Sequence, residues 1–217
     1  MNKGLYDTIL KKYPDVKIVM ASKYLETYAD FKPFLEHHVY RFGENRDDAF
    51  LDKYALLKDH PIEWHFIGTL QTKKVKKVID KIDVLHALDR LKLAEEINKR
   101  RQEALPCYLQ VNISSEPQKH GFEMTELKEV IKTIKTMKNI RLIGLMGMAE
   151  DTNDKTRIKA QFEQLRALRN LYQKEVPTLT ELSMGMSQDY DIALEVGTTV
   201  LRLGRILLDG GNVWDEN

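Results

Sequence analysis

The feature that most constrains the fold is an alternation of short apolar runs with longer amphipathic segments. The longer segments, such as DRLKLAEEINKRRQEA (89–104) and DKTRIKAQFEQLRALRNLYQKE (154–175), have helical spacing, whereas the short runs have the length of buried strands. The short runs are KIVMASK (17–23), VYRFGEN (39–45), EWHFIGTL (63–70), VLHAL (84–88), PCYLQVNI (106–113), RLIGLMGMA (141–149), ELSMGMS (181–187) and VLRLGR (200–205).

Eight β-α alternations in a chain of 217 residues predict an α/β protein, a single closed (β/α)8 TIM barrel. An open doubly wound sheet usually has fewer strands and a glycine-rich phosphate loop after the first of them. Here that position reads ASKYLET, which contains no glycine. Because no Pro/Ser/Gly-rich linker or low-complexity tract interrupts the chain, we expect one domain over residues 1–217.

Composition excludes several classes of function. The 34 Lys and Arg residues nearly balance 33 Asp and Glu residues, so the basic excess of a nucleic-acid or membrane-surface protein is missing. No apolar run approaches the roughly 20 residues of a membrane span. The N-terminal MNKGLYDTILKKYPDVK lacks the pattern of a signal peptide. We therefore expect a cytoplasmic protein, and we expect its single cysteine, Cys107, to be a buried strand residue.

The ends of the predicted strands are unusually polar, and in a barrel the chemistry gathers at the C-terminal strand ends. One member of the set, Asp89, precedes a helical pattern and is expected to be only a helix N-cap. The polar or glycine residues at these ends are Lys23, Glu44, Asn45, Gly68, Gln71, Asp89, Asn112, Ser183, Ser187, Arg202 and Gly204.

Lys23 is the most informative of these residues, since it ends an apolar strand where the chain leaves the barrel. A partly desolvated lysine has a lowered pKa and can attack a carbonyl carbon as the free amine. The alternative is a lysine at the rim that pairs with a nearby carboxylate.

The C-terminal motifs SMGMS and RLGR supply a second half of a site. They follow the seventh and eighth predicted strands, where barrels often bind phosphate through backbone N–H groups. The alternative is that their Gly and Ser residues only form tight turns. A strand-end lysine combined with a phosphate cradle suits an aldehyde-bearing phosphorylated cofactor, and pyridoxal 5'-phosphate (PLP) fits that description.

In these and other motifs the chain resembles the pyridoxal phosphate homeostasis protein family, whose fold is like the N-terminal barrel domain of alanine racemase. The resemblance extends from residue 17 to about residue 210. The matching stretches are VMASK, FGEN, EWHFIGTLQTKK, LQVNISSEPQKHGF, LIGLMGMA, LSMGMSQDYDIALEVGTT and VLRLGRILLDG.

The resemblance implies a role for each matching residue. Lys23 would carry PLP as a Schiff base, and Arg202 would face the pyridine nitrogen and weaken the cofactor as an electron sink. The residues that would hold the phosphate are Ser183 and the backbone of Gly204 and Arg205. Those that would line the rest of the cofactor are Asn45, Asn112, Met146 and Met148.

Three positions depart from the family pattern. Leu25 stands where many members have a second lysine, and Arg205 stands where many have a threonine. The chain reads LQTKK where many members read LQSNK, so that Lys74 is the aligned lysine. The Arg205 change would replace a hydroxyl contact to the phosphate by a guanidinium contact.

Three functions remain open. The first is a PLP carrier in vitamin B6 homeostasis without robust catalysis, and PLP-dependent apoenzymes are its candidate partners. The second is a PLP-dependent amino-acid racemase, and the third is a sugar-phosphate aldolase that uses Lys23. We favour the carrier because racemisation needs a base on each face of the substrate, and no further domain of the racemase kind is expected here. We also expect a monomer.

Overall fold

The computed structural model describes residues 1–114 and 120–208. Part of the LQVNISSEPQKHGF motif, including Lys119, and the C-terminal segment 209–217 lie outside the described residues. Within the part that is described, no helix is both long enough and apolar enough to cross a membrane.

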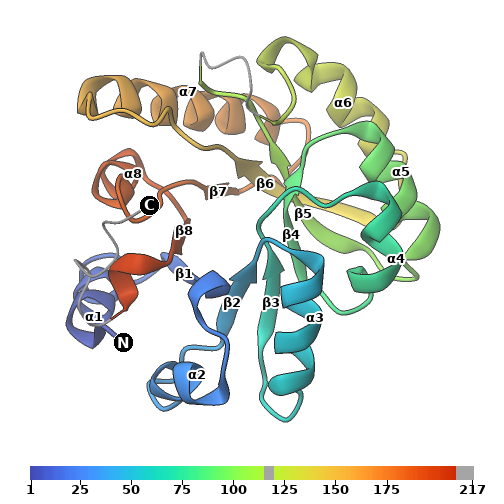
Figure 1. Ribbon diagram of the computed structural model, residues 1–217. Helices are drawn as coiled ribbons and strands as arrows, with labels where there is room; N and C mark the ends of the chain where they lie inside the picture. Colours follow the sequence, from blue (N-terminus) through green and yellow to red (C-terminus); the bar gives the residue numbers. More distant parts are fainter. Residues whose placement is uncertain (115–119, 209–217) are drawn as a thin grey trace.

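The strands form a closed, all-parallel barrel in which each strand pairs with the next and β8 pairs with β1. Every strand begins within one residue of an expected run or inside it, so the prediction of a (β/α)8 barrel is confirmed (Figure 1). The strands are β1 (Lys17–Ala21), β2 (Arg41–Glu44), β3 (Glu63–Phe66), β4 (Val84–Leu88), β5 (Leu105–Gln110), β6 (Ile140–Met146), β7 (Glu181–Ser183) and β8 (Val200–Leu203).

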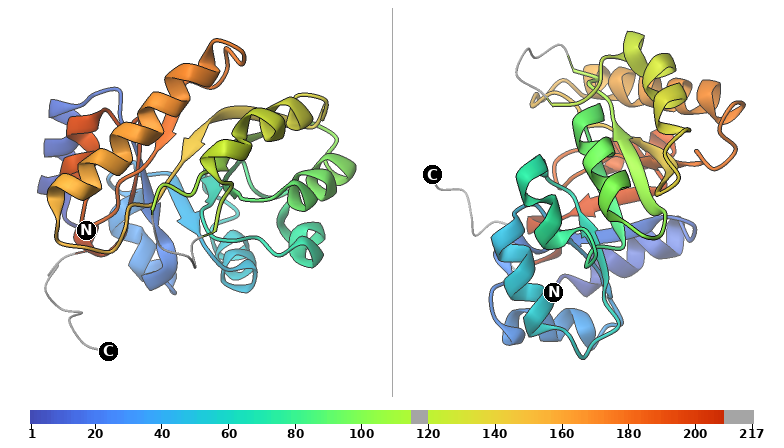
Figure 2. Two further views of the ribbon diagram at one scale, coloured as in Figure 1. Left: turned by 90° about the horizontal axis from the view of Figure 1, so that it is seen from above. Right: turned by 90° about the vertical axis from the view of Figure 1, so that its right-hand side faces the viewer.

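Helices surround the barrel, as the views in Figures 1 and 2 show. They are α1 (Lys3–Lys12), α2 (Tyr28–Leu35), α3 (Asp47–Leu56), α4 (Val75–Val78), α5 (Leu91–Arg100), α6 (Leu127–Ile134), α7 (Lys155–Gln173) and α8 (Tyr190–Val196), with the short 3-10 turns η1 (Ser22–Tyr24), η2 (Thr72–Lys74), η3 (Met124–Glu126) and η4 (Arg205–Leu207). Because α1 precedes β1 and hydrogen-bonds to η4 through Asn2, the N-terminal helix covers the barrel where a helix after β8 would lie.

Local sequence explains where several helices begin and end. The Asp154 carboxylate caps α7 by accepting hydrogen bonds from the N–H groups of Thr156 and Arg157. Helix α8 stops at Gly197, whose φ of 93° is accessible to glycine at little cost. The prediction that Asp89 caps a helix is wrong: the N-cap of α5 is Arg90, and Asp89 instead forms an ion pair with the Arg90 guanidinium.

Side chains on the two faces of the strands enter two different environments. Those facing the helices, including Trp64, Leu109 and Leu201, join a large apolar cluster with helix residues such as Phe50 and Phe162. Cys107 belongs to this cluster, which confirms that it is a buried strand residue, and burial raises the pKa of its thiol. The alternate residues face the inside of the barrel, where polar and charged side chains are frequent.

Candidate functional site at the C-terminal end of the barrel

A cavity of about 350 Å³ lies where the strands end, within the size range of small-molecule sites. Its walls come from the last residues of β1, β2, β5, β6 and β8 and from the segments that follow β1, β2, β3, β5, β6, β7 and β8. Seven of the nine residues proposed from the sequence line it: Lys23, Asn45, Met146, Met148, Arg202, Gly204 and Arg205.

Lys23 reaches this cavity from η1, the turn that directly follows β1. Its ammonium nitrogen lies 4.7 Å from the centroid of the Tyr24 ring. The side chain is exposed, so the expectation of a partly desolvated lysine is wrong for the protein alone. The reason is local: the chain leaves the sheet through an open 3-10 turn, and water reaches Lys23 beside the cavity.

A buried ion pair supports the backbone immediately before Lys23 and at Asn45. The Lys53 ammonium, on α3, donates to the carbonyl of Ser22 at 2.7 Å and to the carboxylate of Glu44. Glu44 in turn accepts from the Ser22 hydroxyl at 3.1 Å and from the Asn45 N–H at 2.8 Å. Because Lys53 and Glu44 are 5% and 1% exposed, this network holds the ends of β1 and β2 in fixed positions.

Lys53 was missed at the sequence level, since a lysine in a charged helical pattern is normally taken as part of a solvated face. The pattern carries no signal that distinguishes it from its neighbours. Its long side chain reaches the ends of β1 and β2 only because α3 packs beside β2, a tertiary contact that the sequence does not show.

Arg202 supplies a fixed positive charge to the same cavity. It is 4% exposed, and its guanidinium donates to the carbonyl and the hydroxyl of Ser183 at 2.7 and 2.6 Å. A third, longer bond of 3.3 Å reaches the carbonyl of Gly147. Burial lowers the pKa of Arg202 to about 10, which the nearby Asp189 partly opposes, so the guanidinium remains protonated at neutral pH.

Two of the proposed residues do not line the cavity. Ser183 is fully buried beneath Arg202, and its hydroxyl is bonded to the guanidinium and to His86. Asn112 binds Glu123 and Ser114 and so stabilises the loop after β5. The hydroxyl that does line the cavity after β7 belongs to Ser187.

Several lining residues were not proposed from the sequence. They include Gln110 and His120, which are joined by a 3.0 Å hydrogen bond from the Gln110 amide to the His120 carbonyl. Others are Tyr24, Ile67, Met186 and Gln188. Gln110 and His120 lie within the family motif LQVNISSEPQKHGF, and that motif was the one sequence feature that could have identified them. No spacing rule placed their side chains at this cavity.

The arrangement suits a flat, apolar ring that carries an aldehyde and an anionic group. Ile67, Met146 and Met148 provide apolar walls, Lys23 provides the amine, and Arg202 provides a buried cation. Near the start of η4, Ser187 and Arg205 provide donors, and the first N–H groups of a helical turn have no acceptor within it.

The chain is similar to known proteins in both sequence and structure. Residues 47–210 match the family model described as alanine racemase, N-terminal domain. The pyridoxal phosphate homeostasis protein of Aquifex aeolicus is 41% identical over 173 residues, covering 76% of this chain and 75% of that protein. The corresponding protein of Helicobacter pylori is 36% identical over 202 residues, covering 88% of this chain and 86% of that protein.

A solved structure extends the likeness to three dimensions. PipY from Synechococcus elongatus, solved with PLP bound, superimposes with a TM-score of 0.85 at 28% sequence identity. The superposition covers 95% of this chain and 98% of PipY. The chain therefore belongs to the pyridoxal phosphate homeostasis protein family, and its barrel is of the alanine racemase N-terminal domain type.

Proposed function

We propose that this protein binds PLP in the C-terminal cavity and serves intracellular PLP homeostasis without robust catalysis. The observation that carries the proposal is the convergence of Lys23, Arg202 and the η4 donors on one cavity of about 350 Å³. The names of its relatives, and the PLP bound to PipY, support the same assignment.

Lys23 is the proposed attachment point, since its amine is the nucleophile that can form a Schiff base with the PLP aldehyde. When bound, PLP supplies an electron-poor pyridine ring that can stabilise negative charge on an attached amine. Arg202 is proposed to face the pyridine nitrogen. A permanent cation there disfavours protonation of that nitrogen and weakens the electron sink, which favours a carrier over an enzyme.

The phosphate is proposed to lie against Ser187 and the start of η4, where Gly204 and Arg205 also line the cavity. Ser183 is the serine expected from the sequence at the phosphate. It instead accepts a hydrogen bond from Arg202 and is proposed to fix that side chain. Asn45 and Met146 are proposed to contact the remaining edge and face of the ring.

The protein is further proposed to act as a cytoplasmic monomer that supplies PLP-dependent apoenzymes. Its exposed large apolar side chains support a monomer because several of them stand on separate elements, such as Leu56 on α3 and Leu171 on α7. Light scattering of the purified protein tests the oligomeric state, and transfer of PLP to an added apoenzyme tests delivery.

The experiment for the main proposal is a titration of the cofactor-free protein with PLP, followed by visible absorbance, and then by an amino-acid turnover assay. The expected result is saturable binding, a spectral shift on adding amino acids, and no sustained product. Absence of saturable binding by a folded protein would rule the proposal out. An aldolase that uses Lys23 would bind no PLP and would remain colourless.

One observation favours the racemase-type alternative. His120 lines the same cavity as Lys23, so a second group able to transfer a proton is present. Sustained formation of D-amino acids by the pure protein, lost in both Lys23→Ala and His120→Ala, would establish that enzyme in place of a carrier.

A further inference from the structure

A line of polar side chains, buried except for Glu63 at its far end, crosses the interior of the barrel from the cofactor cavity to the opposite end. Its contacts run from Arg202 to the Ser183 hydroxyl (2.6 Å), from that hydroxyl to His86 Nδ1 (2.8 Å), from His86 Nε2 to His65 Nδ1 (2.7 Å), and from His65 Nε2 to Glu63 Oε1 (3.0 Å). We call these residues the interior chain: Arg202, Ser183, His86, His65 and Glu63.

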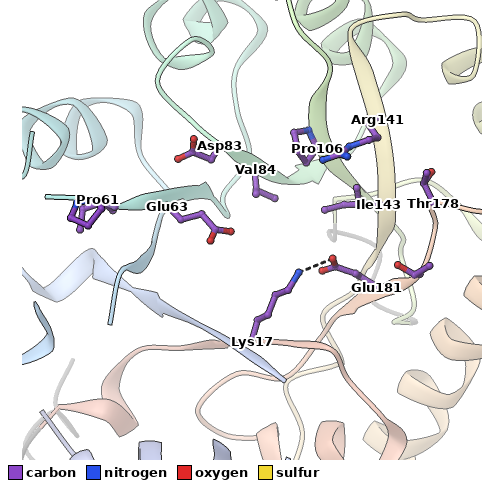
Figure 3. Close-up of a pocket in the computed structure, with 12 residues that line it drawn as sticks. Lys17, Pro61, Glu63, Asp83, Val84, Pro106, Arg141, Ile143, Thr178 and Glu181 are labelled. Carbon is purple, nitrogen blue, oxygen red and sulfur yellow. Dashed lines mark hydrogen bonds and ion pairs between the residues drawn. The ribbon is translucent and has the colours of Figure 1, made fainter. Parts of the chain in front are cut away.

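The interior chain connects two cavities at opposite ends of the barrel. Arg202 lines the cofactor cavity, whereas Glu63 lines a cavity of about 620 Å³ at the N-terminal ends of the strands. Figure 3 shows Glu63 directed into this second cavity, together with Lys17 and Glu181, which form an ion pair of 2.8 Å. The other carboxylate oxygen of Glu63 accepts from Arg41 at 3.0 Å.

The two ends fix the direction of every hydrogen bond between them. An arginine can only donate, so Arg202 donates to the Ser183 oxygen. The Glu63 carboxylate can only accept, because the hydrogen bond from His65 is the main reason that its pKa is lowered to about 2. His65 therefore carries hydrogen on Nε2. If His65 is neutral, its Nδ1 accepts from His86 Nε2–H, and His86 Nδ1 accepts from the Ser183 hydroxyl.

The reverse direction leaves a hydrogen atom unsatisfied. It would need a proton on His65 Nδ1 and on His86 Nδ1, so that Ser183 would receive two donors while its own hydrogen faced no acceptor within the interior chain. In the neutral arrangement each hydrogen along the interior chain, from Arg202 to Glu63, has an acceptor. Both histidines are thus assigned as neutral Nε2–H tautomers.

The groups around His86 favour its neutral form. It is packed between Ser183, His65 and the ring of Tyr108, whose centroid lies 4.4 Å away, with Lys17 and Arg202 as the charges that act on it. Burial holds the pKa of His86 well below its usual value, and the nearby cations Arg202 and Lys17 lower it further, as would a proton added to His65.

We propose that Glu63, His65 and His86 are positioning residues that fix Ser183 and Arg202 at the cofactor cavity, and that they couple the N-terminal end of the barrel to the bound cofactor. This inference rests on the proposed PLP site. Hydrogen bonds that all point one way polarise one another, so a change at Glu63 alters the bond between Ser183 and Arg202. Arg202 then shifts relative to the cofactor ring.

The decisive variant is Glu63→Gln, with Asp83→Asn as its matched control. Both replace a carboxylate by a carboxamide in the same N-terminal cavity, but Asp83 accepts from the N–H of Trp64 at 2.7 Å and lies outside the interior chain. Arg41 and His65 bond to different oxygens of Glu63, so a carboxamide in the same position presents its oxygen to one of them and its NH₂ group to the other. When its NH₂ group faces His65, the interior chain must reverse.

Two measurements on the full-length protein test the proposal. Histidine ¹⁵N NMR of the cofactor-free protein should show Nε2–H tautomers for His65 and His86 in the parent and in Asp83→Asn, and an added Nδ1–H population in Glu63→Gln. In the PLP-loaded protein, Glu63→Gln should shift the visible absorption band and weaken PLP binding by up to roughly tenfold, the worth of one charge-assisted hydrogen bond. Asp83→Asn should match the parent.

The outcomes separate this proposal from the PLP proposal. A charged His65 in the parent, or a Glu63→Gln protein with the tautomers, spectrum and PLP affinity of Asp83→Asn, would overturn the positioning role. A parent protein that binds no PLP would overturn the proposed function instead, while the NMR result on the cofactor-free protein would still decide the direction of the interior chain.

Discussion

The two faces of the barrel strands differ in how many polar side chains they carry. The face toward the helices is almost wholly apolar: Trp64, Leu109 and Leu201 are buried against helix residues such as Phe50 and Phe162, and burial of such side chains stabilises the fold. The interior face is buried just as deeply, yet it carries His65, His86 and the rest of the interior chain. Apolar side chains such as Val19, Met146 and Val200 pack beside these polar residues, so the interior holds both kinds of side chain.

The difference separates stability from function. Replacing apolar contacts between sheet and helices should alter the free energy of unfolding and leave the cofactor site unchanged. Polar contacts inside the barrel add little net stability, because desolvation offsets much of their energy, but they impose definite geometry on Arg202. Each prediction below tests one side of that division, beginning with the largest effect.

Phe162→Ala should lower the free energy of unfolding by about 3–5 kcal/mol, since it leaves a cavity in the layer between α7 and the sheet. Denaturant unfolding measures the loss. The folded variant should bind PLP with the parent's affinity. Ser183→Ala should weaken PLP binding and should lower the free energy of unfolding by less, about 1–3 kcal/mol, because it leaves the buried His86 Nδ1 without its donor. If Phe162→Ala and Ser183→Ala changed both the free energy of unfolding and the PLP affinity equally, the separation of stability from function would be contradicted.

Lys53→Met should destabilise the protein by about 3 kcal/mol, because it leaves the Glu44 carboxylate buried without its cation. This pair is the exception to an apolar helix-facing layer, and it lies directly behind Lys23. The double variant Glu44→Gln with Lys53→Met should recover part of the stability. Failure of the second substitution to recover any stability would contradict the assigned pairing.

Pyridoxal, which lacks the phosphate, should bind more weakly than PLP by about 2 kcal/mol or more, the worth of the charge-assisted hydrogen bonds at Ser187 and η4. Arg205→Ala should narrow the difference if its guanidinium helps to hold the phosphate, and Arg205→Thr should restore it. Isothermal titration with both compounds measures the difference. Equal affinities for pyridoxal and PLP would show that the phosphate is not bound at the start of η4.

Acid should weaken the fold through His86 before most carboxylates titrate. Its pKa is lowered in the folded state, so the unfolded chain binds the proton first. The associated stability is therefore present above about pH 6.5 and declines as pH falls below it, by at most about 1.4 kcal/mol per pH unit. Unfolding curves from pH 8 to pH 5, at roughly half-unit steps, measure the slope. The same slope in His86→Phe would assign the effect to other groups.

The sequence predicted the barrel and part of the cavity lining, because both depend on local patterns. Alternating apolar runs locate the strands, and a residue at the C-terminal end of a parallel strand must lie at one end of the barrel. Lys23, Asn45, Gly204 and Arg205 could be placed in this way.

The depth of a residue inside the barrel depends on strand register, which a single strand does not reveal. Ser183 ends β7 but lies under Arg202, because β8 extends further toward the cavity. His65 and His86 meet only because β3 pairs with β4 so that His65 is level with Val84. No spacing in the sequence connects these two histidines, and the interior chain was therefore not predicted.

The most direct test of the account is the identity of the lysine that holds PLP. The protein should be loaded with PLP, reduced with borohydride, digested and mapped by mass spectrometry. We expect a phosphopyridoxyl group on the peptide that contains Lys23, and loss of the visible absorption band of bound PLP in Lys23→Ala. An adduct on another lysine, such as Lys74 or Lys119, together with an unchanged band in Lys23→Ala, would contradict it.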